Sequence, residues 1–225
     1  TGGIETFVIG LLERIKGHEV IVFTSAQGDT SEYDQNWLDQ YGVGVIRDRS
    51  KILLPSWRIT RRAKEIVKLH NIDVIIFGAA APLALMAPAL RKLGVKKIVA
   101  LTHGHEVWWA KIFPFNLAMR RIGSAVDHLT YLGEFTRNAI AQSLTQRSAD
   151  AMVKIAPGID TSHFIPQPDS MQKRITLGLE DKKIIISVGR LVHRKGQDKL
   201  IQAMPAVLQK VPNAHLLLVG EGPYR

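Results

Sequence analysis

The sequence contains no cysteine, and this absence removes two classes of structure. Without cysteine the chain has no disulfide framework and no thiolate metal site, which fits a reducing, cytoplasmic compartment. It also lacks an apolar run of about 18 residues, the length that a membrane-spanning helix needs. No targeting segment is recognisable, although the chain opens on Thr1. We therefore expect a globular protein rather than a disulfide-bonded or membrane-spanning one.

Aromatic residues are scarce at 7%, whereas hydrophobic residues reach 46% of the 225 positions. This composition can bury the core of one large or two modest domains and excludes a disordered chain. The charge is unbalanced, with a net +10 that favours polyanionic partners. Because neither zinc-finger spacing nor a basic region leading into heptads is present, anionic lipid or phosphorylated substrates are expected, and no nucleic-acid partner.

Short apolar strands alternate with helical patterns along the chain. Helices are predicted at 4–15 (closed by Gly17), 56–70, 82–93, 134–143 and 197–209, and strands at 19–24, 73–77, 97–102, 128–132, 152–156, 184–188 and 215–219. The polar stretch after Thr24 is predicted to be a loop, and Pro205 to kink or break the last helix. This alternation predicts an α/β fold with doubly wound parallel sheets.

The pattern restarts after residue 157 and divides the chain in two. Residues 1–157 are predicted to form an N-terminal Rossmann-like domain without its first strand, because the opening glycines lead directly into a helix. Residues 158–225 are predicted to be the start of a second Rossmann-like domain, which is only partly present.

Two segments have the character of phosphate-binding loops. Gly2 and Gly3 precede a helix, where backbone N–H groups and the helix dipole favour an anion, although a plain turn is an alternative. Arg190 and Lys195 follow a strand that ends at Gly189, the edge where open α/β sheets bind ligands. Together these cations could neutralise a departing diphosphate; a solvated basic loop is the alternative.

A further glycine pair, Gly220 and Gly222, follows the next strand. The third glycine of the dinucleotide-binding fingerprint is replaced by Arg225, so a nicotinamide enzyme is disfavoured. No serine stands in a nucleophile-elbow pattern, and no nucleophile constellation appears.

Three polar side chains, His103, His105 and Glu106, follow the strand predicted at 97–102. Because ligands bind at the carboxyl ends of parallel strands, His103 could hydrogen-bond a sugar or move a proton. Metal binding through His103 and His105 is an alternative, but no third ligand is evident, so no bound metal is expected. A purely structural histidine is the other alternative.

Two groups of residues suit a membrane surface or a lipid acceptor. One is the basic face of the helix at 56–70, formed by Arg58, Arg61, Arg62 and Lys68. The other is an aromatic stretch with nearby cations: Trp108, Trp109, Phe113, Phe115, Lys111, Arg120 and Arg121. Basic residues beside aromatic ones are typical of contacts with anionic lipid, although a solvated helix and core aromatics would look similar.

Taken in order, several segments resemble the family 4 retaining glycosyltransferases of GT-B fold over essentially the whole chain. They are Gly2-Gly3-Ile4-Glu5, Gly17-His18-Glu19-Val20, Pro157-Gly158-Ile159-Asp160 with Phe164, Gly189-Arg190-Leu191 with Arg194-Lys195-Gly196, and Val219-Gly220-Glu221-Gly222-Pro223. The segments at 77–85 and 102–110 resemble a narrower group of that family, the actinobacterial mannosyltransferases that add a second mannose to phosphatidylinositol monomannoside. The family's paired-glutamate motif has no counterpart up to Arg225.

The resemblance implies a role for each matching residue. Gly3 would lie near the donor diphosphate, and His103 would touch the transferred sugar. Arg190 and Lys195 would hold the diphosphate, with Gly222 in a donor-side loop.

The resemblance also implies the reaction. GDP-mannose would be the donor, a glycolipid the acceptor and the new linkage α-1,6, with front-face attack, no required cofactor or metal, and a peripheral location on the inner face of the plasma membrane. Such an enzyme would act in phospholipid biosynthesis. Another nucleotide sugar or acceptor, or an inactive ligand- or membrane-binding fragment, is the alternative.

Overall fold

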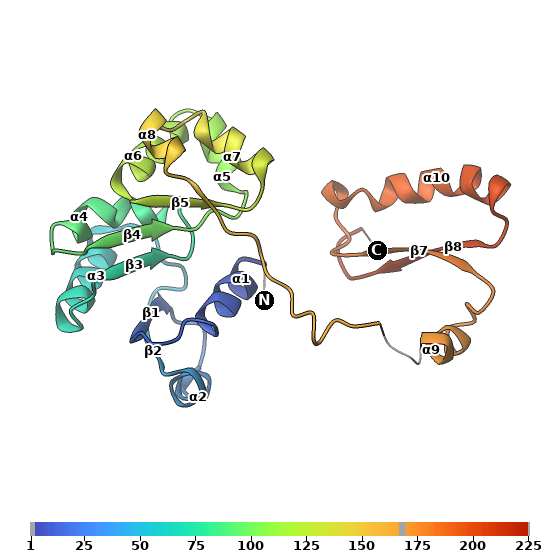
Figure 1. The fold of residues 1–225 in the computed structure, drawn as a ribbon, viewed down its shortest axis with the longest axis horizontal. Helices are drawn as coiled ribbons and strands as arrows, with labels where there is room; N and C mark the ends of the chain where they lie inside the picture. The colour runs from blue at the N-terminus through green and yellow to red at the C-terminus, as the bar shows by residue number, and fades with distance from the viewer. Residues whose placement is uncertain (1–2, 167–169, 225) are drawn as a thin grey trace. The chain divides into compact units, whose positions relative to one another are not determined.

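The structure, a computed structural model, describes residues 3–166 and 170–224 (Figure 1). The chain divides into two compact units, one ending at Gly158 and the other beginning at Ile159. Every strand pair in the described residues is parallel. The α/β fold with parallel sheets that the sequence predicts is therefore confirmed.

The first unit holds a four-stranded sheet in the order β3-β4-β5-β6 and a separate parallel pair, β1-β2. Its strands are β1 Val20–Ser25, β2 Val43–Asp48, β3 Val74–Phe77, β4 Lys97–Ala100, β5 His128–Tyr131 and β6 Val153–Lys154. Its helices are α1 Gly3–Leu12, α2 Ser31–Tyr41, α3 Trp57–Leu69, the 3-10 helix η1 Leu83–Met86, α4 Ala87–Arg91, α5 Glu106–Lys111, α6 Phe115–Ala125, α7 Glu134–Ala141 and α8 Gln146–Asp150.

The core of this unit lies between the four-stranded sheet and its helices. Helix α3 begins where Ser56 accepts the N–H of Ile59, and it buries one apolar stripe formed by Ile59, Ala63, Ile66 and Val67. All of that stripe except Ile66 belongs to one buried cluster with Ile98 of β4, Leu129 of β5 and side chains of α6. Burying a side chain of this size contributes about 1.5–3 kcal/mol, so the sheet is a firm base for the loops at its carboxyl edge.

The prediction of a loop after Thr24 is wrong, because α2 and β2 occupy most of that stretch. Their charged residues give this stretch the composition of a loop, but in the fold these residues pair with one another. Arg47 of β2 donates two hydrogen bonds of 2.7 Å to the Asp34 carboxylate of α2. Trp37 is the buried residue of α2, and it anchors a helix whose other side chains are mostly polar.

Three helix boundaries also differ from the prediction. The first helix ends at Leu12, short of Gly17. The stretch 82–93 is split into η1 and α4 because Pro88 has no N–H to donate, and it lies at the start of α4. The break expected at Pro205 is absent, since the last helix runs through it. Pro205 is exposed, so the carbonyl that loses its partner can turn toward water.

The second unit is a strand–helix–strand element with one preceding helix. It contains α9 Ser170–Thr176, β7 Lys183–Val188, the 3-10 helix η2 His193–Lys195, α10 Gln197–Lys210 and β8 Ala214–Val219. Strands β7 and β8 pair from Lys183↔Ala214 to Val188↔Val219. None of the helices in the described parts of the chain has the length and apolarity that crossing a bilayer requires.

Candidate active site

The carboxyl end of β4 is fixed to β5 by two hydrogen bonds. The hydroxyl of Thr102 donates to the carbonyl oxygen of Thr130 at 2.6 Å, and the N–H of Thr102 donates to the Thr130 hydroxyl at 3.2 Å. Both threonines are buried. The backbone that precedes His103 is therefore held firmly against β5.

The imidazole of His103 is bound in one tautomer. Its Nε2 lies 2.7 Å from the carbonyl oxygen of Gly78, at the end of β3. A carbonyl oxygen only accepts, so Nε2 must carry a hydrogen, and in the neutral ring Nδ1 is then the acceptor. No partner for Nδ1 is found among the described residues. His103 can thus accept a hydrogen bond from a sugar hydroxyl.

Helix α1 contacts this histidine through Phe7. The ring of Phe7 meets the His103 ring edge to face, with centroids 5.4 Å apart. Gly3 lies four residues earlier, on the same face of α1 as Phe7. The contact with His103 is thus made by Phe7, and Gly3 lies one turn earlier in the helix, while Gly2 lies outside the described residues.

The ring of His105 also points to a backbone carbonyl, with Nε2 3.3 Å from the oxygen of Ala81. Its neighbour Glu106 is fully buried, and its carboxylate accepts the N–H of His103. In the described parts of the chain, no group of three His, Asp or Glu side chains could hold a metal ion. The geometry thus links His103, His105 and Glu106 to one another and to the loop after β3.

In the second unit, Arg190 and Lys195 flank the turn between β7 and α10. Both side chains are exposed, and neither forms an ion pair with any described residue. Lys195 and Gly196 directly precede Gln197, the first residue of α10. The positive end of that helix dipole adds to the two cations, so this turn is suited to an anion.

The glycines after β8 have a structural role that the sequence did not reveal. The loops after β7 and β8 continue the sheet's pairing: the N–H of Gly189 donates to the Val219 carbonyl, and that of Leu191 to the Glu221 carbonyl, both at 2.9 Å. A Cβ on Gly220 would overlap the Gly189 carbonyl, and one on Gly222 the Leu191 carbonyl. Both glycines therefore allow the loop that carries Arg190 to lie against its neighbour.

Replacing Gly222 by alanine is expected to lower the free energy of unfolding by roughly 1–3 kcal/mol, the usual cost of overpacking. Thermal unfolding measures the loss. Gly158→Ala is the control, because nothing lies within 4 Å of its added Cβ. Equal stability of the two variants would contradict the close approach at Leu191.

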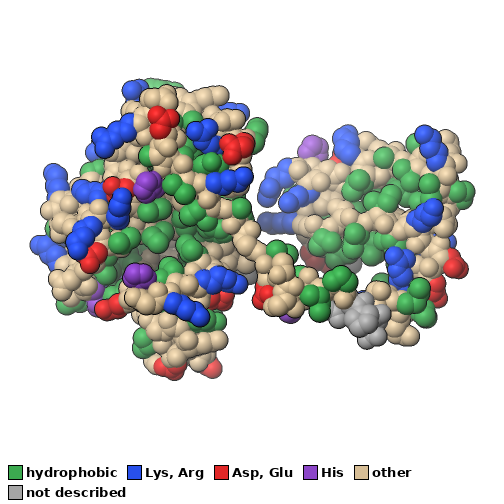
Figure 2. Space-filling view, in the orientation of Figure 1, with side chains coloured by type: hydrophobic (Ala, Val, Ile, Leu, Met, Phe, Trp, Pro, Cys, Tyr) green, Lys and Arg blue, Asp and Glu red, His purple; other side chains and the backbone are tan. Residues whose placement is uncertain are grey.

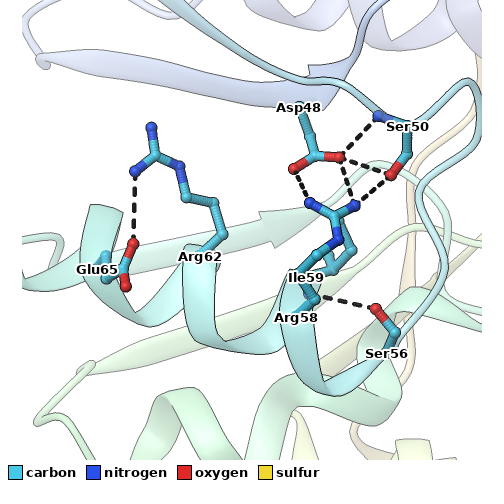
Figure 3. Close-up of polar contacts among 7 residues, drawn as sticks. All are labelled: Asp48, Ser50, Ser56, Arg58, Ile59, Arg62 and Glu65. Carbon is cyan, nitrogen blue, oxygen red and sulfur yellow. Dashed lines mark hydrogen bonds and ion pairs between the residues drawn. The ribbon is translucent and has the colours of Figure 1, made fainter.

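Arg58, predicted on the basic face of α3, is engaged inside the first unit (Figure 3). Its guanidinium donates to both oxygens of Asp48, at 2.7 and 2.8 Å, and to the hydroxyl of Ser50. The hydrogen bonds from Arg58 and then from Ser50 hold the pKa of the Asp48 carboxyl well below its ordinary value. Arg58 therefore joins the end of β2 to α3 and is not a free cation of the surface.

Two further basic side chains of α3 share one acid. Arg61 and Arg62 both donate to Glu65, at 3.0 and 3.4 Å, and the second contact is drawn in Figure 3. The Arg61 guanidinium also lies 5.8 Å from the centroid of the Trp57 ring, which is 78% exposed. The basic face of α3 is thus weaker than predicted, although it keeps an excess of positive charge with Lys68. Figure 2 shows other lysine and arginine side chains over the visible face of both units.

The two predicted surface tryptophans differ in environment. Trp109 is half-buried and packs against the hydrophobic core. Trp108 is 51% exposed, and the Phe115 ring contacts both indoles, tilted against Trp108 and edge to face with Trp109, with ring centroids 4.7 and 4.9 Å apart. Exposed apolar side chains from α5, α6 and their connection form what we call the aromatic patch: Trp108, Ile112, Phe113 and Leu117.

Comparison with known proteins identifies the family. The model of Glycosyltransferase Family 4 matches residues 1–163, and that of Glycosyl transferases group 1 matches residues 169–225. The chain belongs to glycosyltransferase family 4. The GT-B type of fold that the sequence predicts is confirmed as well, with a TM-score of 0.69 to Anabaena Alr3699/HepE in complex with UDP and glucose. That structure is 17% identical, and the match covers 99% of this chain and 59% of the other.

Two curated relatives show the level of similarity. A GDP-mannose-dependent alpha-(1-6)-phosphatidylinositol monomannoside mannosyltransferase of Mycolicibacterium smegmatis is 37% identical over 99% of this chain. The monoacylated-acceptor counterpart of Corynebacterium glutamicum is 36% identical over 99%. The chain spans 58% of the length of each of these relatives. This family 4 chain therefore resembles mannosyltransferases over nearly all of its own length.

Proposed function

We propose that the protein is a retaining mannosyltransferase that moves mannose from GDP-mannose to a phosphatidylinositol mannoside and forms an α-1,6 linkage. The observation that carries the proposal is the anion-binding turn of Arg190 and Lys195 at the start of α10, in a chain 37% identical to a GDP-mannose-dependent relative. Other nucleotide sugars also carry a diphosphate, so the identity to that relative supports mannose in particular.

In this proposal the chemistry depends on charge and position. As the bond between the sugar and the diphosphate breaks, Arg190 and Lys195 neutralise the growing charge on the leaving group. The acceptor hydroxyl enters on the face that the diphosphate leaves, and its proton passes to the departing phosphate. Nδ1 of His103 accepts a hydrogen bond from a hydroxyl of the mannose and holds the ring in place. Two cations supply the charge that a divalent metal would supply elsewhere, so no cofactor is proposed.

The test is transfer of labelled mannose by the full-length protein. GDP-mannose with an extracted phosphatidylinositol mannoside acceptor should give a product one mannose larger. Parallel reactions with UDP-glucose and GDP-glucose serve as donor controls. Transfer from UDP-glucose alone would indicate another family 4 enzyme, and binding of a nucleotide sugar without any transfer would indicate an inactive ligand-binding protein.

We further propose that the first unit is the acceptor domain and that it binds an anionic membrane surface, where a glycolipid acceptor would lie. The aromatic patch supports this, since Trp108 and the 74% exposed Phe113 are close in sequence to the exposed Lys111, and the exposed Arg120 follows on α6. The excess charge of α3 at Arg61, Arg62 and Lys68 supplies a second, weaker contact. Aromatic and basic side chains together favour the boundary between headgroups and acyl chains.

Binding to anionic vesicles is expected to fall steeply as salt is added. Each exposed cation near such a surface is worth about 1 kcal/mol, and salt at about 0.1 M screens charges beyond about 10 Å. Co-sedimentation with vesicles of phosphatidylinositol and phosphatidylcholine measures this. Phe113→Ser should weaken binding at every salt concentration, whereas Ile52→Ser, at an equally exposed site outside the patch, should not. Binding that is independent of both salt and lipid charge would contradict the proposal.

A further inference from the structure

Glu106 has an environment that is costly for a carboxylate. Among the described residues it is the only charged side chain with none of its surface exposed. An acid taken out of water loses its hydration, and the loss is offset only by hydrogen bonds or by an opposite charge. The few groups that touch this carboxylate therefore indicate its role.

Each carboxylate oxygen faces a different histidine. Oε2 accepts the backbone N–H of His103 at 2.9 Å. Oε1 lies 3.3 Å from Nε2 of His105, in a geometry too poor for a regular hydrogen bond, and it has no other partner among the described residues. Because Nε2 of His105 has two acceptors nearby, Oε1 and the carbonyl oxygen of Ala81, that nitrogen must carry a hydrogen.

His103 is consequently held at both ends. Its ring donates to Gly78 through Nε2, and its main chain donates to Glu106. Gly104 lies between His103 and His105, the two residues that contact the Glu106 carboxylate. Its φ of 98° is a backbone conformation that residues with a side chain rarely adopt. Glycine adopts this conformation without strain, and the carboxylate of Glu106 contacts the residues on both sides of it.

We propose that Glu106 is a positioning residue for His103. Its carboxylate accepts the His103 N–H and lies against the ring of His105, and this keeps Nδ1 of His103 facing the mannose. The inference rests on the proposed function only for the contact between Nδ1 and the sugar. Without the carboxylate, the His103 N–H would be left without a partner and the ring would leave the position that transfer needs.

The experiment compares three variants of the full-length protein. Glu106→Ala removes both contacts, and Glu106→Gln keeps one accepting oxygen of nearly the same shape. Asp127→Asn is the matched control: Asp127 also accepts a backbone N–H of β4, from Ile98 at 2.7 Å, but at the opposite end of the strand. For each protein, kcat and KM for GDP-mannose are measured, together with the tautomers of the histidine rings by nitrogen NMR.

Glu106→Ala should lower kcat by about tenfold to a hundredfold, the cost of misplacing a contact group by about 1 Å, while KM stays within about threefold. The His103 ring should lose its single Nε2–H tautomer. Glu106→Gln should recover only part of kcat. Its amide nitrogen is a donor, so in either orientation it faces another donor, the His103 N–H or the His105 Nε2–H, and cannot accept from it. Asp127→Asn should lose stability yet keep kcat within about twofold.

The proposal is overturned if Glu106→Gln matches the wild type in both kcat and histidine tautomers, a result that stands even where Glu106→Ala does not fold. It is equally overturned if both Glu106 variants lose no more kcat than Asp127→Asn. Failure of the proposed function has a different signature: the wild type transfers no mannose, yet the Nε2–H tautomer of His103 is present and is lost in the Glu106 variants.

Discussion

Replacing Arg190 by alanine is expected to weaken the binding of GDP by about 1.5–3 kcal/mol, which is roughly tenfold to a hundredfold in Kd. The reason is the unpaired guanidinium at the turn between β7 and α10, where two N–H groups can meet two phosphate oxygens. Lys195→Ala should have a smaller effect, because an ammonium offers a point charge without that fork. Titration calorimetry on the full-length protein measures both losses.

The matched control is Arg194→Ala, in the same turn. Arg194 is equally exposed, and it was the member of this basic segment predicted to be solvated. Its loss should change GDP affinity by less than about twofold at moderate salt, where distant charges are screened. An Arg190→Ala protein with wild-type affinity would remove Arg190 from the site. If both arginine variants lost the same GDP affinity, the effect would come from general positive charge and not from a specific contact of Arg190.

Most strands were predictable because parallel strands commonly appear as short apolar runs. The runs at 74–77, 98–100 and 184–186 are of that kind, and each lies in a strand within a few residues of its predicted place. Strand β2 was missed because Arg47 and Asp48 give it the composition of a loop. Their partners, Asp34 and Arg58, are ten or more positions away, and local pattern does not show that a distant side chain satisfies a charge.

The candidate site shows the same division between local and distant information. The place of His103 at a strand end follows from topology, so sequence alone predicted it. Its tautomer depends on the carbonyl of Gly78, which only folding brings near. The importance of Glu106 was hidden for a related reason: an acid at the start of a helix is ordinary, and only its complete burial is unusual. A glutamate between an apolar strand and Val107-Trp108-Trp109 was the available signal.

Replacing His103 by alanine is expected to lower kcat for mannose transfer by about 10²–10³, while GDP affinity changes by less than about twofold. The two effects differ because Nδ1 of His103 contacts the mannose in the proposed complex. GDP lacks the mannose, so its binding does not depend on that contact. His128→Ala is the control, because its ring also bonds a backbone carbonyl, that of Ala151 at 3.0 Å, but at the opposite end of the sheet. Kinetics and calorimetry on the full-length variants separate the two quantities, and elemental analysis of the same samples tests for metal.

Near-normal turnover would leave His103 as a structural residue. Stoichiometric zinc that disappears in His103→Ala or His105→Ala would replace the sugar contact by a metal site.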